Sequence, residues 1–274
     1  MPLRGLQLAV ALIALLVSAQ AAAATPDSAR ESAVEDYLAV VDPGLDIWRS
    51  EWDFYGWWPA FMDGESTVDG VTVPLDNGLD NKFNLRNWGV GTRLESWMGP
   101  WGVIVDVGYT RFDSDVGKEP QQTVGRIDQF VADLGLGFRL NESGGKQPFT
   151  VDVIAIFRYA ILKQSVYSPP RTDWVEGKQN YAEFAVGLQF RKKISERWWL
   201  WARGDIGGFG WSQSSQLTYN VFVGASFELT ADGGSMIKFG WRLYDIDYEL
   251  REDPGAFAWN ATVHGPFVSY TWVF

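Results

Sequence analysis

Charged residues of both signs recur inside the most regular stretches of this sequence. Arg93 and Glu95 stand two positions apart, as do Arg203 and Asp205. Residues two apart in a strand share a face, so each pair places two charges on one side. A wall of one sign is typical of a selective pore, whereas mixed signs indicate ion pairs that fill an interior. We expect an inward-facing network of Arg93, Glu95, Asp106, Asp133, Arg139, Asp152, Arg158, Glu183, Arg203, Asp205, Lys238 and Arg242.

The sequence offers little for catalysis beyond these charges. It has no cysteine and one histidine, His264, so thiol nucleophiles and thiolate metal ligands are absent. The nearest serine along the chain, Ser269, falls on the opposite face of an extended strand, roughly 16 Å away. A hydrogen-bonded Ser–His pair is therefore not expected there. We predict no catalytic residue, no metal site and no cofactor, and we interpret His264 as an interfacial or luminal side chain.

The charges lie in segments whose apolar and polar residues alternate. From Gln129 to Leu140 every even position is apolar, while the odd positions include Asp133 and Arg139. The alternation predicts strands, and their length of about ten residues favours membrane-crossing strands over soluble ones, which average five or six. We expect ten strands at 49–60, 86–97, 102–113, 127–140, 149–163, 180–191, 198–209, 217–229, 235–247 and 257–274, with eight as the alternative.

The composition fits an all-β, closed antiparallel transmembrane barrel. After the N-terminus no stretch is long and apolar enough for a membrane helix, yet 46% of residues are hydrophobic and 15 are Trp. Barrels of this class carry aromatic residues at both membrane interfaces. We expect the periplasmic interface at Trp97, Trp101, Trp198, Trp199, Trp272 and Phe274, and the outer one at Trp58, Tyr109, Tyr159, Trp211 and Tyr219.

The first 45 residues predict export followed by a periplasmic segment. Arg4, an apolar run and an alanine-rich stretch are typical of a cleaved signal peptide, which we place at 1–24. Residues 25–45 would then form a periplasmic segment with a short helix, since Ser28 and Glu31 match a capping box. The barrel is assigned to 46–274, and the protein to the outer membrane.

The predicted connections are alternately short and long, as expected for short periplasmic turns and longer outer loops. The longest, at 61–85, contains Val68-Asp69-Gly70-Val71, which is typical of a tight hairpin, so this loop is expected to project as a ribbon. The loops are acidic and the net charge is −11, which argues against nucleic acid as a partner. The expected partners are outer-membrane lipid and lipopolysaccharide, and the oligomeric state stays open.

The last strand ends on alternating apolar residues: Val268, Tyr270, Trp272 and Phe274. This ending resembles the C-terminal signal of bacterial outer-membrane barrels, which implies recognition by the barrel-insertion machinery and by periplasmic chaperones. The chain also resembles a family of uncharacterised, small porin-like or OmpA-like outer-membrane barrels over roughly 52–274. The residues that carry this resemblance are Asp53-Phe54-Tyr55-Gly56-Trp57-Trp58-Pro59, Arg203-Gly204-Asp205-Ile206-Gly207-Gly208-Phe209-Gly210, Gly240-Trp241-Arg242-Leu243-Tyr244-Asp245-Ile246-Asp247-Tyr248 and His264-Gly265-Pro266.

Three functions remain open at this point. The first is a structural or narrow-pore, porin-like barrel without catalytic activity, which the mixed inward charges favour. The second is a lipid- or peptide-modifying enzyme that uses His264 and inward carboxylates. The third is a surface binding or adhesion protein that acts through the loops at 61–85 and 164–179.

Overall fold

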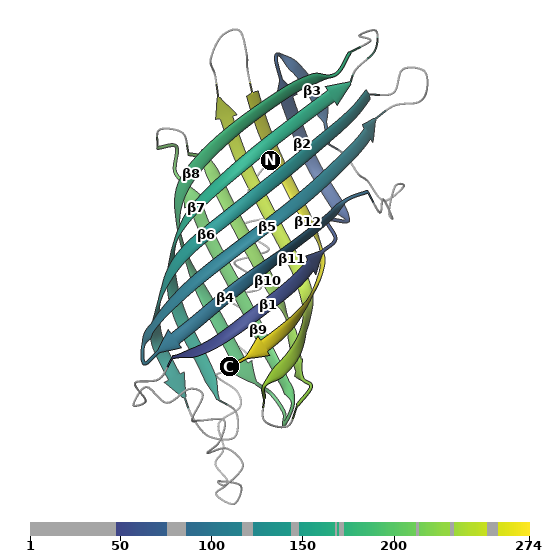
Figure 1. Ribbon diagram of the computed structural model, residues 1–274. Helices are drawn as coiled ribbons and strands as arrows, with labels where there is room; N and C mark the ends of the chain where they lie inside the picture. Colours follow the sequence, from purple (N-terminus) through teal and green to yellow (C-terminus); the bar gives the residue numbers. More distant parts are fainter. Residues whose placement is uncertain are drawn as a thin grey trace, which may run out of the picture.

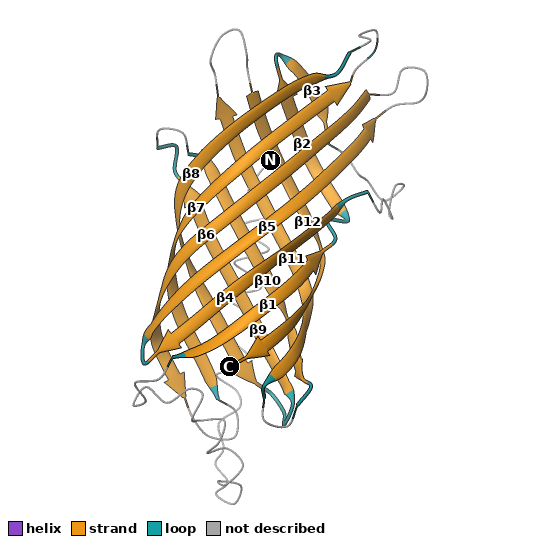
Figure 2. Ribbon diagram, viewed as in Figure 1, coloured by secondary structure: helices purple, strands orange, loops and turns teal. Residues whose placement is uncertain are grey.

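The computed structural model describes residues 48–75, 86–116, 123–143, 148–167, 169, 173–211, 214–230, 233–250 and 257–274. The expected signal peptide and the helix near Ser28 lie outside these ranges. Within them every regular element is a β-strand (Figure 2). No helix of the described part is long and apolar enough to cross a membrane.

Ten antiparallel strands close a barrel, with β1 hydrogen-bonded to both β4 and β12 (Figure 1). The prediction of a closed barrel of about ten strands is confirmed, and the alternative of eight is wrong. The ten are β1 (Arg49–Trp57), β4 (Trp88–Met98), β5 (Trp101–Val116), β6 (Thr123–Ser143), β7 (Phe149–Tyr167), β8 (Val175–Lys193), β9 (Trp198–Gly208), β10 (Leu217–Glu228), β11 (Ser235–Leu250) and β12 (Phe257–Val273).

The two ends of the barrel differ in their connections. Short connections at 99–100, 144–148, 194–197 and 229–234 gather at the end where β12 finishes, which we name the turn end (Figure 1). Connections of six to thirteen residues join strands at the opposite end, which we name the loop end. Outer-membrane barrels carry short turns on the periplasmic side and longer loops outside. The turn end is therefore the expected periplasmic end.

Two further strands, β2 (Phe61–Val68) and β3 (Val71–Pro74), extend the wall beyond β1. Residues 267–273 of β12 pair with β1, and residues 257–264 of β12 pair with β2. The interruption at 58–60 lies opposite Pro266, whose carbonyl accepts a hydrogen bond from the Trp58 backbone at 3.0 Å. Proline has no N–H to donate to a ladder, so it suits a place where the neighbouring strand breaks.

The hairpin prediction is confirmed, but its setting differs from the expected loop. Asp69 and Gly70 both have positive φ, 49° and 72°, as a two-residue hairpin turn requires. However, 61–68 belongs to the sheet through its pairing with β12 and is not a loop. Pro59 lies in the three-residue break at 58–60 that separates β1 from β2, and its missing N–H suits that place.

The outer face of the barrel is apolar. Along β6, Leu134 and Leu136 are 58% and 63% exposed, whereas the preceding Asp133 faces inward and is 7% exposed. Phe184 of β8 is 67% exposed. A contiguous apolar surface of this extent is costly in water and suits contact with lipid chains. The alternation along each strand thus separates a lipid-facing surface from a polar or packed interior.

The expected interface aromatics divide into two groups. Trp101, Trp198, Trp272 and Phe274 are exposed beside the turns of the turn end, Tyr159 and Trp211 are exposed elsewhere, and Tyr109 is half-buried on the outer face. Four others differ from the expectation. Trp97 and Trp199 face the lumen because they share parity with Glu95 and Arg203, Tyr219 is only 3% exposed, and Trp58 lies within the wall beside Pro266.

Candidate functional site

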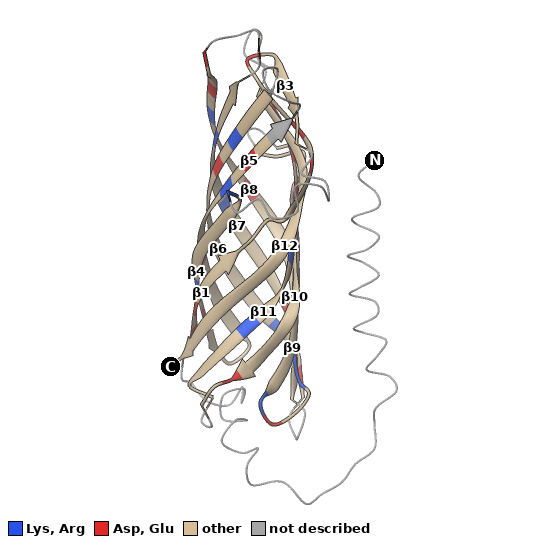
Figure 3. Cartoon of the chain, turned by 90° about the vertical axis from the view of Figure 1, so that its right-hand side faces the viewer, with Lys and Arg blue, Asp and Glu red and all other residues tan. Residues whose placement is uncertain are grey.

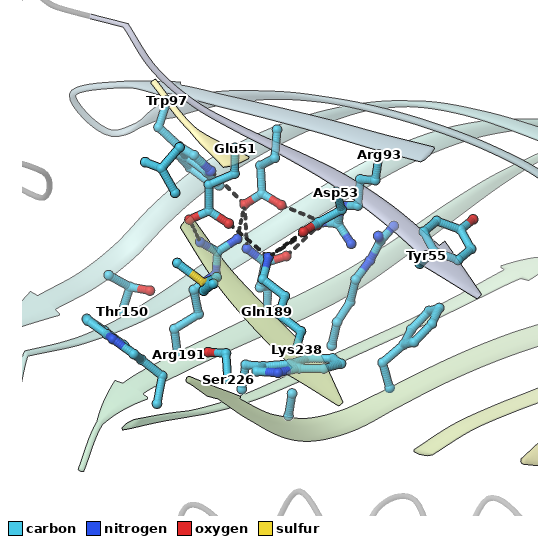
Figure 4. A pocket seen from close by; sticks show the side chains of 18 of the residues that line it. Glu51, Asp53, Tyr55, Arg93, Trp97, Thr150, Gln189, Arg191, Ser226 and Lys238 are labelled. Atoms are coloured by element: carbon cyan, nitrogen blue, oxygen red, sulfur yellow. Dashed lines mark hydrogen bonds and ion pairs between the residues drawn. The ribbon is translucent and has the colours of Figure 1, made fainter. Parts of the chain in front are cut away.

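The lumen at the turn end contains a hydrogen-bonded network centred on Glu95, and Figure 4 labels its partners Arg93, Trp97, Gln189 and Arg191. Its Oε1 accepts hydrogen bonds from Trp97 Nε1 at 2.7 Å, from Gln189 Nε2 at 2.6 Å and from Arg191 Nη2 at 2.7 Å. Its Oε2 accepts one from Arg93 Nη2 at 2.6 Å. A buried carboxylate with several donors is well satisfied, so this group holds four side chains in fixed places.

The same network joins opposite walls of the barrel. Arg191 of β8 also donates to Glu51 of β1, with Nη1 and Oε1 2.5 Å apart. In the ring of ten strands β1 and β8 are five steps apart in either direction. Lys238 of β11 reaches the second oxygen of Glu51 at 3.0 Å and Asp53 Oδ1 at 2.9 Å. The turn-end half of the lumen is therefore braced by ion pairs from wall to wall.

A second charged cluster surrounds Arg158 at mid-height. The guanidinium binds Asp133 through two hydrogen bonds of 2.9 and 3.0 Å. It also donates to Asp205 at 2.9 Å and to Glu183 at 3.3 Å. Register pairing places Asp133 and Glu183 on the strands either side of β7, directly across from Arg158. One buried cation thus pairs with three carboxylates, and its removal would leave them facing each other.

The half of the lumen toward the loop end is apolar. We name this cluster the apolar core: Trp57, Met62, Val68, Val73, Leu75, Phe112, Ile127, Ala160, Leu162, Val166, Tyr181, Tyr244, Ile246, Tyr248, Phe257, Trp259, Ala261 and Val263. Trp259 is fully buried, and its ring lies 5.7 Å from that of Phe112 and 6.4 Å from that of Tyr244. Aromatic rings at these separations are in favourable contact.

Contacts in the apolar core also join opposite walls. Gln129 of β6 donates to the hydroxyl of Tyr244 of β11 at 3.0 Å, and these strands are again five steps apart. The β2–β3 hairpin contributes Ser66, whose hydroxyl donates to Gln164 Oε1 of β7 at 2.9 Å. Val73 and Leu75 of the hairpin are 1% exposed. The loop-end half of the lumen is accordingly filled from wall to wall.

Beside the Glu95 network lies a cavity of about 120 Å³, which we name the turn-end cavity. It is lined by charged residues of the Glu95 network and by the rings of Trp201, Phe222 and Phe267. Figure 4 shows Glu51, Arg191 and Lys238 projecting toward one another beside it. A smaller void of about 20 Å³ lies beyond it, between Tyr55 and Arg158. Such a void has room for about one water molecule.

The structure places all twelve charged residues of the expected network inside the barrel, and Figure 3 shows charged segments within the wall strands. Most fall into the Glu95 and Arg158 groups. Arg139 and Asp152 form a separate ion pair at 2.8 Å, and Arg203 lies 3.9 Å from Asp106 and 3.8 Å from Asp205. Arg242 belongs to neither group. Its guanidinium lies over two aromatic rings, 4.4 Å from the centroid of Trp57 and 4.8 Å from that of Phe222.

Four further residues of the turn-end network were missed: Glu51, Asp53, Gln189 and Arg191. The signal for them was present, because Glu51 and Asp53 are two apart in the first strand, and Gln189 and Arg191 share parity with Glu183. The packing of the Trp97 ring against two glycines was also predictable. Gly102 and Gly137 leave room for it, since an added Cβ would lie 2.7 and 2.5 Å from its ring.

His264 lies on the outer side of β12, away from the lumen carboxylates. Its ring stacks on Phe61 with centroids 4.9 Å apart, and Trp241 lies 5.9 Å away. β12 pairs with β11 through Gly265 and Pro266 without a register shift, so no bulge turns the His264 side chain toward the lumen. In the described part of the chain, no three His, Asp or Glu side chains are grouped to hold a metal ion.

Comparisons with known proteins bear on the fold. No protein-family model matches the chain, and no curated protein matches it in sequence. The outer-membrane protease OmpT of Escherichia coli is similar in structure, with a TM-score of 0.51 and 9% identity over 85% of this chain and 100% of its own. Ail, the attachment invasion locus protein of Yersinia pestis, gives a TM-score of 0.38 and 12% identity over 84% of this chain and 100% of its own.

The fold is that of a bacterial outer-membrane β-barrel. Neisserial surface protein A also matches, with a TM-score of 0.34 and 8% identity over 82% of this chain and 96% of its own. These names cover a protease, an attachment protein and a surface protein. The comparisons therefore support the fold and assign no activity to this chain.

Proposed function

We propose that this chain is an exported outer-membrane barrel that does not form a diffusion pore. The observation that carries this is the apolar core, which joins β6 to β11 and packs the β2–β3 hairpin against β7. An open aqueous channel needs a continuous polar path, whereas here buried aromatic side chains occupy the loop-end half. Of the two forms of the first hypothesis, the filled structural barrel is favoured over the narrow pore.

The enzyme hypothesis receives no support from His264, because that ring lies on the outer face between Phe61 and Trp241. The lack of catalytic activity stays a prediction. Binding through outer loops also stays a proposal; of the expected loops at 61–85 and 164–179, residues 76–85, 168 and 170–172 fall outside the described ranges.

A liposome-swelling assay tests the proposal. The mature protein, reconstituted into liposomes, is expected to leave the permeability to small sugars at the level of protein-free vesicles. A heat-modifiable band on gels shows that the same sample is folded. Swelling that rises with the amount of folded protein contradicts the proposal. A reconstituted general porin provides the positive control.

A further inference from the structure

Arg203 is a buried cation whose hydrogen-bonding capacity is unused. It is 3% exposed and lines the turn-end cavity. None of its Nε, Nη1 and Nη2 atoms has a hydrogen-bond partner. Asp106 and Asp205 lie 3.9 and 3.8 Å from it, which is ion-pair distance but too long for a hydrogen bond. Buried donors without partners are costly, so this arrangement calls for an acceptor.

Trp201 supplies a second unused donor on the same face of β9. It stands two residues before Arg203 and lines the same cavity. Its buried Nε1 also has no hydrogen-bond partner. By contrast, Trp97 and Trp199, which line the cavity nearer the turn end, donate to Glu95 and Glu228 at 2.7 and 2.6 Å. Arg93 Nε and Thr150 Oγ1 of the same lining also have no hydrogen-bond partner, but Arg203 is the side chain on which every donor nitrogen is unused.

An aromatic surface adjoins these donors. Phe267 lies 5.5 Å from the Trp201 ring and 5.7 Å from the Phe222 ring, measured between centroids. Phe222 is the register partner of Arg203 on the next strand. An apolar protein cavity of about 150 Å³ binds benzene. The turn-end cavity, at about 120 Å³, is of the same order of size.

Cationic side chains outnumber anionic ones along the cavity lining, while Asp152 and Asp205, which pair with Arg139 and Arg203, lie outside it. Six cationic and four anionic side chains line it. The cations are Arg49, Arg93, Arg139, Arg191, Arg203 and Lys238, and the anions are Glu51, Asp53, Glu95 and Asp106. Glu51, Asp53 and Glu95 accept hydrogen bonds from Lys238, Arg191 or Arg93. This leaves Arg203 as the cation without a hydrogen-bonded acceptor on that part of the wall.

We propose that the turn-end cavity binds a small carboxylate that carries an aromatic or short hydrocarbon group. The carboxylate accepts hydrogen bonds from Arg203 and from the Trp201 indole, and the apolar group packs against Phe222 and Phe267. The ligand enters from the turn end, where Arg49, Ser50 and Val273 line the cavity. This site goes beyond the proposed function, because ligand binding in the turn-end half does not require the loop end to be closed or open.

Titration of the refolded full barrel in detergent micelles with benzoate tests the proposal by isothermal titration calorimetry. Benzyl alcohol and benzylammonium are the matched neutral and cationic probes. Benzoate is expected to bind saturably at one site, at least about tenfold more tightly than either probe, because hydrogen bonds to a charged group are lost with them. The absence of saturable benzoate binding, as for a cavity filled by water only, overturns the proposal, and so does equal binding of all three probes.

Two variants locate the site. Arg203→Met is expected to weaken benzoate binding at least about tenfold. Arg111→Met is the matched control, because it removes an arginine whose partner, Asp128, lies outside the lumen cavity, and it should leave binding unchanged. Unchanged binding in Arg203→Met overturns the proposal.

If Arg203→Met does not fold, the native protein still provides the test. The ¹⁵N-indole signal of Trp201, assigned by its loss in Trp201→Phe, is expected to shift with benzoate along the calorimetric binding curve. Saturable binding that leaves this signal in place puts the ligand elsewhere and overturns the proposal.

Discussion

The two halves of the lumen are closed in different ways. Toward the loop end, the apolar core is packed around Trp259 and Tyr244, which are 0% and 2% exposed. Toward the turn end, ion pairs such as Glu51–Arg191 cross the lumen and leave a cavity beside them. Apolar side chains can fill space in any direction, whereas ion pairs need specific geometry and leave gaps. On our proposals, the first half seals the barrel and the second offers a place for a ligand.

The largest expected effect concerns the charged half. Arg158→Met leaves Asp133, Glu183 and Asp205 buried without their shared cation. We expect a loss of about 3–5 kcal/mol in the free energy of unfolding, measured by urea denaturation of the barrel in lipid vesicles. The control is Arg111→Met, which breaks an ion pair of a 35% exposed arginine and should cost less than about 1 kcal/mol. Equal losses in the two variants would contradict the mid-height cluster.

The apolar core should respond next. Leu162 is fully buried there, so Leu162→Ala removes packed methyl groups and leaves a void. We expect a loss of about 2–4 kcal/mol by the same denaturation. Leu136→Ala is the matched control, because Leu136 is 63% exposed on the outer face, where lipid fills the space. If the control lost as much as Leu162→Ala, tight packing of the core would not hold.

A smaller effect is expected where glycine makes room for a ring. A Cβ at Gly137 would lie 2.5 Å from the Trp97 ring, so Gly137→Ala should destabilise the barrel by about 1–3 kcal/mol. The double variant with Trp97→Phe should recover part of that loss. Gly56→Ala is the control, because no atom lies within 4 Å of its added Cβ. Thermal unfolding, followed by the gel shift of the folded band, ranks the three variants.

The smallest effect concerns a single hydroxyl in the apolar core. Tyr244→Phe removes the acceptor of the Gln129 hydrogen bond and the partner of the Tyr181 hydroxyl at 3.2 Å. We expect a loss of about 1 kcal/mol. A loss above that of Leu162→Ala would mean that hydrogen bonds, and not packing, hold this half together.

Much of the architecture could be predicted from the sequence because a strand repeats every two residues. That period gave ten strands and set the inward position of residues such as Asp133 and Arg158. The predicted side-chain positions are wrong where they rest on residue type and not on the two-residue period. Trp97 and Trp199 were placed at the interface because tryptophan is common there, although their parity with Glu95 and Arg203 points inward.

The rest depended on contacts that no local pattern contains. The pairing of β12 with both β1 and β2 follows from a break opposite Pro266, which is more than 200 residues away in sequence. The Glu51–Arg191 pair joins residues 140 apart across the lumen. The cavity beside Arg203 exists because several strands meet around it. Such features require the closed barrel, whereas strand alternation requires only a local segment.

The central claim is that the apolar core closes the lumen. Single-channel recording of the refolded mature protein in planar bilayers tests it most directly, with gel-shift evidence that the protein is folded. The account predicts no conductance steps from the native barrel. Steady, reproducible steps that scale with the amount of inserted native protein would contradict it.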